Sequence, residues 1–122
     1  MEIPTNLKLQ NSKNHGLGIF AITPLDVEEV LGEFTGEIML KTKFTELYGK
    51  DIRYTYWNKH NFKTTTVIVA KNPRNFITYI NEAIIPNVKL VKKKLIVVRN
   101  IGVDEELFLL YSKNYQRDYI VL

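Results

Sequence analysis

Short segments rich in β-branched and aromatic residues, interrupted by turn residues about every 8–12 positions, run through most of this chain. The strands predicted from these segments cover residues 18–22, 30–34, 37–40, 64–70, 88–91, 95–99 and 105–111. Many short strands of this kind are typical of a mostly β fold that is built from several small sheets.

Two pairs of these segments have the spacing of β-hairpins. Thr35 and Gly36 separate the strands predicted at 30–34 and 37–40, which is the length of a tight two-residue turn. A lysine-rich turn at 92–94 separates the strands predicted on either side of it. We therefore expect each pair to form an antiparallel hairpin.

Helix-forming sequence is scarce. Residues 41–48 can form two helical turns, and Gly49 is a typical residue at the end of a helix. Residues 75–80 can form one further turn. With 122 residues, of which 45% are hydrophobic, the chain has the size and the apolar content of a single domain that spans residues 1–122.

The residue types that are missing narrow the choice of function. There is no cysteine, and the two histidines, His15 and His60, do not have the spacing of metal ligands, so we expect neither disulfides nor a metal site. No apolar run is long enough to cross a membrane. The first residues contain an acidic side chain and no apolar core of a signal peptide, so we expect an intracellular protein.

The formal net charge of +4 is mild. The densest basic run, at 89–94, coincides with the predicted hairpin turn, and a solvated turn explains it better than a nucleic-acid surface does. We therefore expect no direct binding of nucleic acid, although a basic β domain that binds it through 89–94 remains an alternative. The small size of the chain makes a homodimer a reasonable expectation.

Four places carry residues that suit a ligand site, namely His15-Gly16-Leu17-Gly18, Glu33-Phe34-Thr35-Gly36-Glu37, Asn75 with Asn81, and Tyr111. The glycines of His15-Gly16-Leu17-Gly18 allow close approach of the backbone to a ligand, and Asn81 offers an amide that must be satisfied if it is buried. Asn75 and Tyr111 are further polar candidates. Each has an ordinary structural explanation on its own, because glycines form turns, asparagines cap helices and buried tyrosines bond to carbonyls.

The same places form four motifs in a definite order. They are Gly16-Leu17-Gly18-Ile19-Phe20-Ala21, then Phe34-Thr35-Gly36-Glu37, then the block from Arg74 to Ala83 with Pro86-Asn87 after it, and last Arg99-Asn100-Ile101 with Glu105-Glu106-Leu107 and Tyr111. In this order and spacing the chain resembles the SET domain family of protein lysine methyltransferases. Without cysteine-rich flanks, it resembles the minimal stand-alone SET proteins of viruses and microbes.

The resemblance implies a fold and a reaction. The fold is a set of small β-sheets around a pseudoknot, with short helices. The reaction is the transfer of a methyl group from S-adenosylmethionine to a lysine of a protein, such as a histone or another basic tail. A chromatin target would imply a nuclear location.

The resemblance also implies roles for single residues. Tyr111 would be the catalytic tyrosine. Six residues would contact the cofactor, namely Gly16, Leu17, Gly18, Asn75, Asn81 and Glu82. Four would line the channel for the lysine, namely Tyr54, Tyr56, Leu109 and Tyr115. Leu109 has no hydroxyl group that could hold a water molecule. We therefore expect that more than one methyl group can be added to the substrate lysine.

The chain departs from the family pattern close to the predicted cofactor pocket. Glu82 stands where the family has histidine, Ala83 where it has serine, Thr78 where arginine is common, and Leu110 where aspartate is usual. These departures leave one alternative open, which is a SET-like module with weak or no catalysis that binds a peptide or a protein partner.

Overall fold

The structure is a computed structural model of the 122-residue chain. It describes the backbone of residues 1–13, 16–48, 55–59, 65–70 and 74–110. Side chains are described for the same residues except Tyr48, 55–59 and 65–67.

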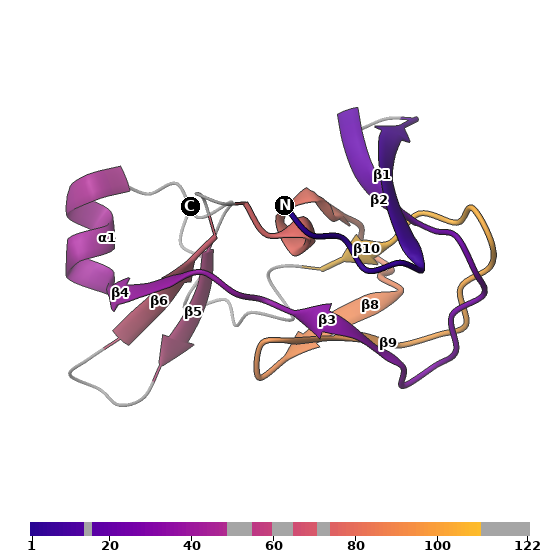
Figure 1. The fold of residues 1–122 in the computed structure, drawn as a ribbon. Coiled ribbons are helices and arrows are strands. Elements are labelled where there is room, and N and C mark those ends of the chain that lie inside the picture. The colour runs from indigo at the N-terminus through magenta and orange to yellow at the C-terminus, as the bar shows by residue number, and fades with distance from the viewer. Residues whose placement is uncertain (14–15, 49–54, 60–64, 71–73, 111–122) are drawn as a thin grey trace.

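Within the described residues the strands form four small sheets, as the mostly β prediction requires (Figure 1). Two of the sheets have two strands each. Strand β1 (Leu7–Ser12) pairs antiparallel with β2 (Gly16–Ala21). Strand β7 (Asn81–Glu82) pairs parallel with β10 (Phe108–Leu109). One three-stranded antiparallel sheet has the order β3 (Val30–Glu33), β9 (Lys94–Val97), β8 (Val88–Val91). The other has the order β4 (Glu37–Leu40), β6 (Thr65–Val69), β5 (Thr55–Lys59).

The helical predictions are confirmed. The helix α1 covers Lys41–Tyr48, and a single 3₁₀ turn, η1, covers Phe76–Tyr79. Asn75 caps η1, because its side-chain oxygen accepts a hydrogen bond from the backbone N–H of Ile77 at 2.9 Å. No helix among the described residues is long and apolar enough to cross a membrane.

The lysine-rich hairpin is confirmed. Strands β8 and β9 pair in register up to Val91 opposite Lys94, which leaves Lys92 and Lys93 as the two turn residues. Both have positive φ, 48° and 73°. A two-residue turn with positive φ at both positions matches the right-handed twist of the strands that it joins.

The hairpin predicted around Thr35 and Gly36 is wrong. Strand β3 pairs with β9, whereas β4 pairs with β6, so residues 34–36 carry the chain from one three-stranded sheet to the other. Gly36 is needed for a different reason from the predicted one. A Cβ atom at Gly36 would collide with the backbone of Val69 and Ala70, so the glycine allows a close approach between backbones.

The strands β1, β5 and β7 were not predicted, although the pattern of β1 was readable. Strand β1 alternates apolar Leu7 and Leu9 with polar residues, which is the period of a strand with one buried face. It pairs with β2 along its whole length, from Leu7 opposite Ala21 to Ser12 opposite Gly16.

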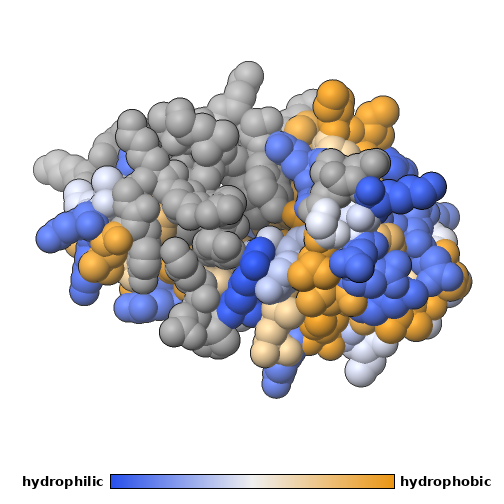
Figure 2. All heavy atoms as spheres, turned by 90° about the horizontal axis from the view of Figure 1, so that it is seen from above, coloured by the Kyte–Doolittle hydropathy of each residue, from blue (hydrophilic) through white to orange (hydrophobic). Residues whose placement is uncertain are grey.

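Among the described residues, a hydrophobic core joins the sheets. Its members come from strands on both sides of η1 and include Ile19, Phe34, Ile77, Leu95 and Leu109, each no more than 2% exposed. Burial of this apolar surface is the main favourable contribution to folding. Many apolar side chains stay outside the core, and Figure 2 shows several of them (orange) grouped among hydrophilic ones on the face seen from above.

The segment 104–109 lies between two distant parts of the chain. On one side the N–H of Leu107 donates to the carbonyl oxygen of Ile19 in β2 at 2.8 Å. On the other side the N–H of Asn87 donates to the carbonyl oxygen of Phe108 at 3.1 Å. Strand β2 and the segment after β7 are therefore held together by residues that follow them in sequence.

The close backbone approach at Gly36 leads to a stability prediction. We expect Gly36→Ala to lower the free energy of unfolding by about 1–3 kcal/mol, because the added methyl group forces backbone atoms apart. Chemical denaturation measures the change. Gly102→Ala is the control, since the nearest atom to its Cβ would be the Glu105 Oε1 at 3.8 Å. Equal stability of the two variants would contradict this explanation of Gly36.

Candidate functional site

The carboxylate of Glu106 gathers residues from separate segments. Its Oε1 accepts a hydrogen bond from the Ser12 hydroxyl at 2.7 Å. Its Oε2 accepts one from the Asn81 Nδ2 at 2.8 Å. These partners lie at the end of β1 and the start of β7, so one half-buried side chain ties both strands to the segment 104–109.

Gly18 makes room for this arrangement. A Cβ atom at Gly18 would collide with Glu106 and would lie 3.0 Å from the Asn81 Nδ2. Sequence reasoning assigned the missing side chain to the approach of a ligand. In the structure the space beside Gly18 is taken by Glu106 and Asn81. Gly16 has a positive φ of 76°, and no atom of the described residues lies within 4 Å of the position that a Cβ would take there.

The hydrogen bonds of Asn81 determine the orientation of its amide. The Nδ2 group donates to the carbonyl oxygen of Leu17 at 3.0 Å and to Glu106. Both partners are acceptors, so the NH₂ group must face them. The amide oxygen, Oδ1, therefore faces away from them, and it accepts no hydrogen bond from any described residue.

Asn81 lies on the wall of a small cavity. The cavity has a volume of about 280 Å³ and is lined by Leu17, Arg74, Thr78, Tyr79 and Asn81. This volume is just below the usual range of small-molecule pockets, roughly 300–1,000 Å³. Such a cavity suits a part of a cofactor, and two of the six predicted cofactor contacts, Leu17 and Asn81, lie on its wall.

Arg74 is held rigidly at this cavity. Its Nε donates to the Thr78 hydroxyl oxygen at 2.8 Å, and its Nη2 donates to the Thr78 carbonyl oxygen at 3.2 Å. The guanidinium carbon lies 3.5 Å from the centre of the Tyr79 ring, which is a cation–π geometry. A positive charge is thus held on the wall of the cavity that Asn81 also lines.

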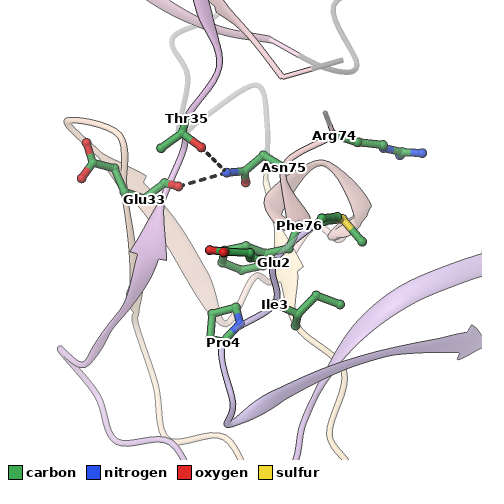
Figure 3. Close-up of a pocket in the computed structure, with 9 residues that line it drawn as sticks. Glu2, Ile3, Pro4, Glu33, Thr35, Arg74, Asn75 and Phe76 are labelled. Atoms are coloured by element: carbon green, nitrogen blue, oxygen red, sulfur yellow. Dashed lines mark hydrogen bonds between the residues drawn. The ribbon is translucent and has the colours of Figure 1, made fainter. Parts of the chain in front are cut away.

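Asn75 has a different setting from Asn81. It lines a second cavity of about 610 Å³ that Glu2, Ile3, Pro4, Glu33 and Phe76 help to form (Figure 3). Its Nδ2 donates to the Glu33 carbonyl oxygen at 3.1 Å and to the Thr35 hydroxyl at 3.0 Å. With its oxygen capping η1, the amide has a structural function, and a contact with a cofactor stays a prediction.

Asn87 is buried completely. Its Nδ2 donates to the Glu106 carbonyl oxygen at 2.8 Å, and its Oδ1 accepts from the Phe108 N–H at 2.7 Å. A buried amide that satisfies two backbone groups of another segment specifies where that segment runs. The Pro-Asn pair of the sequence motif therefore supports the backbone beside Glu106.

Two other predicted site residues are paired in the short parallel sheet. Glu82 is exposed and lies opposite Leu109, which is fully buried in the hydrophobic core. Their predicted roles, at the cofactor and in the lysine channel, stay predictions. The pairing of β7 with β10 nevertheless places Glu82, a predicted cofactor contact, next to Leu109, a predicted channel residue.

Three predicted site residues, Tyr54, Tyr111 and Tyr115, lie outside the described residues. Tyr56 belongs to β5, opposite Ile68 of β6, but its side chain is not described. The catalytic and channel assignments of these four tyrosines therefore stay predictions.

Sequence reasoning did not assign a role to two residues that organise the site. Glu106 was considered as part of the Glu-Glu-Leu motif and of a possible acidic groove, but not as a partner of Asn81 and Ser12, which lie 25 and 94 residues away. The partner of Arg74 is closer in sequence, because Arg74 comes just before the cap of η1 and Thr78 lies within that turn.

A family model of the SET domain matches residues 16–112. The chain belongs to the SET domain family. The match covers the predicted site residues that the structure describes, from Gly16 to Leu109. A comparison with curated protein sequences finds no match for this SET domain.

Solved structures share the fold of this SET domain. A humanized mutant of the Chaetomium thermophilum Polycomb Repressive Complex 2, bound to an inhibitor, is similar with a TM-score of 0.71 and 21% identity, over 90% of this chain and 15% of that chain. The methyltransferase domain of human PR domain-containing protein 2 is similar with a TM-score of 0.69 and 19% identity, over 88% of this chain and 77% of that chain. These likenesses show the predicted SET fold.

The buried amide of Asn87 leads to a second prediction. We expect Asn87→Ala to lower the free energy of unfolding by about 2–4 kcal/mol, because two buried backbone groups lose their partners. Thermal or chemical unfolding measures this loss. Asn11→Ala, at an exposed position of β1, is the matched control and is expected to change stability by less than about 0.5 kcal/mol. A small effect at Asn87 would contradict its supporting role.

Proposed function

We propose that this SET domain transfers a methyl group from S-adenosylmethionine to a lysine side chain of a protein. The observation that carries the proposal is the convergence of Leu17, Asn81 and Glu106 beside one cavity. These residues come from three of the four motifs that define the family resemblance. Membership of the SET domain family supports the same function.

The described residues fit the amino-acid end of S-adenosylmethionine. The Asn81 Oδ1 is an oriented acceptor, which suits the ammonium group of an α-amino acid. The open backbone at Gly16 allows close approach of a ligand. When bound, S-adenosylmethionine supplies a methyl group on a positively charged sulfur.

The lysine must reach this methyl group as a neutral amine. A lysine has a reference pKa of about 10.4, so at neutral pH only on the order of one in a thousand is neutral. An apolar channel lowers this pKa because burial disfavours the charged form. We assign the channel to Tyr54, Tyr56, Leu109 and Tyr115, and the buried Leu109 is the member whose apolar surroundings are described.

Tyr111 completes the proposed catalytic site. Its hydroxyl oxygen would orient the amine or accept weak C–H···O contacts from the methyl group. Fixing the two reacting groups in line then supplies much of the rate acceleration. Among the residues that the structure describes, no cluster of metal-ligating side chains is found, and the proposed mechanism uses none.

We propose a histone or another basic tail as the substrate, which would place the protein in the nucleus if the target is chromatin. The alternative is a SET-like module that binds a peptide or a protein partner with weak or no catalysis. The departures at Glu82 and Thr78 favour this alternative. The Thr78 hydroxyl oxygen accepts a hydrogen bond from the Arg74 Nε. The side chain of Glu82 is exposed.

Cofactor binding is the first test. We expect isothermal calorimetry to show binding of S-adenosylmethionine, and we expect Asn81→Ala to weaken it by about 10- to 100-fold through loss of a hydrogen bond to a charged group. Asn11→Ala is the control and should bind as the original chain does. If the original chain does not bind S-adenosylmethionine, the proposed function fails.

Methyl transfer is the second test and separates the enzyme from the binding module. Mass spectrometry of histones incubated with the protein should show methylated lysine, with more than one methyl group per lysine because Leu109 carries no hydroxyl. We expect Tyr111→Phe to slow the transfer by about tenfold or more. Cofactor binding without any transfer would favour the module, and strictly monomethylated product would refute the role given to Leu109.

A further inference from the structure

The hairpin of β8 and β9 carries its lysines on its outer face and at its tip. The two strands lie side by side (Figure 1). Their inward-facing side chains are no more than 4% exposed, and they are Val88, Leu90, Leu95 and Val97. Lys89 and Lys94 alternate with these residues and are exposed. Lys92 and Lys93 form the turn, so the basic run at 89–94 lies on one surface of the sheet.

The tip of the hairpin is held in place. The Lys93 carbonyl oxygen accepts a hydrogen bond from the N–H of Phe34 at 2.7 Å. Lys92 and Lys93 both have positive φ, a conformation in which Asn and Gly are the usual residues. Lysine is therefore an unfavourable residue for this turn, and unfavourable backbone conformations are often retained where they serve a function.

Most of the positive charge of the hairpin is not neutralised within the described protein. The Lys93 Nζ lies 3.6 Å from the Glu33 Oε1. Lys89, Lys92 and Lys94 form no ion pair with any residue that the structure describes. Three charges of one sign thus lie close together on an exposed surface, and such a surface attracts a polyanion.

The spacing of these lysines suits an anion of high charge density. A strand rises about 3.3 Å per residue, and neighbouring strands lie about 4.8 Å apart, so the lysines of the hairpin fall within roughly 10 Å of one another at their Cα atoms. A nucleic-acid duplex carries one negative charge per about 1.7 Å of its axis, so several phosphates face a surface of this size. Lysine binds phosphate as a flexible point charge, whereas paired recognition of carboxylates favours arginine.

We propose that the outer face and the tip of the β8–β9 hairpin bind the phosphate backbone of duplex nucleic acid. The inference takes up the alternative that the sequence left open, and it does not rest on the proposed methyl transfer. The hairpin residues 88–97 include neither arginine nor an aromatic residue, so we expect binding without sequence preference. A polyanion would also attract a basic tail, which a protein of net charge +4 repels.

The test measures binding of a short fluorescent DNA duplex of mixed sequence by anisotropy at several salt concentrations. We expect the original chain to bind at low salt and to lose affinity steadily as salt rises. The double variant Lys89→Gln with Lys92→Gln should bind about tenfold more weakly at low salt. It should also lower the slope of log affinity against log salt by about 2, because each phosphate contact contributes about 0.9.

The control variants separate the hairpin from an effect of net charge. Lys13→Gln with Lys43→Gln removes two positive charges at exposed positions outside the hairpin, and it should weaken binding by less than about threefold. Glu33→Gln removes the negative charge next to Lys93 and should strengthen binding by about twofold or more. Thermal unfolding checks that every variant is folded at the temperature of the measurement.

Equal weakening by the two double variants would show an effect of net charge alone and would overturn the assignment. Absence of duplex binding by the original chain at low salt would do the same. A flexible polyglutamate peptide is measured under the same conditions, and if it binds through the same lysines as tightly as the duplex, an acidic protein segment is the partner and the proposal fails. The cofactor is absent from all these measurements, so their failure leaves the proposed methyl transfer standing.

Discussion

The hydrogen bonds around Glu106 are the constraint on which the site depends. The carboxylate accepts from Ser12 and Asn81, and Gly18 leaves the space that it needs. The backbone on either side of it is fixed as well, because the buried amide of Asn87 binds the Glu106 carbonyl oxygen and the Phe108 N–H. The segment 104–109 is thus hydrogen-bonded to β1, β2 and β7 and fixes their relative positions.

This constraint is what supports the proposed ligand site. The Asn81 amide must present its nitrogen to two acceptors inside the protein, which leaves its oxygen as the group available to a ligand. The polar wall of the cavity is then completed by Arg74, which Thr78 and Tyr79 hold in position. Of the departures from the family pattern, Thr78 lies on this wall, and Glu82 and Ala83 directly follow Asn81 in sequence.

Local features of the fold were predictable, and long-range ones were not. The helix at Lys41–Tyr48 and the lysine-rich hairpin depend on neighbouring residues, and both were predicted correctly. The hairpin around Gly36 failed because the identity of a strand's partner depends on segments far away in sequence. The roles of Asn81 and Glu106 share this limit, since the motifs indicated that a site exists but not which of its polar groups face each other.

The most direct measurement of the central claim is a crystal structure of the protein with S-adenosylhomocysteine. The account predicts that the ammonium group of the ligand lies within hydrogen-bond distance of the Asn81 Oδ1, roughly 2.7–3.2 Å. It also predicts that the Asn81 Nδ2 still donates to Leu17 and Glu106. A ligand bound elsewhere, or an Asn81 amide released from Glu106 when the ligand binds, would contradict it.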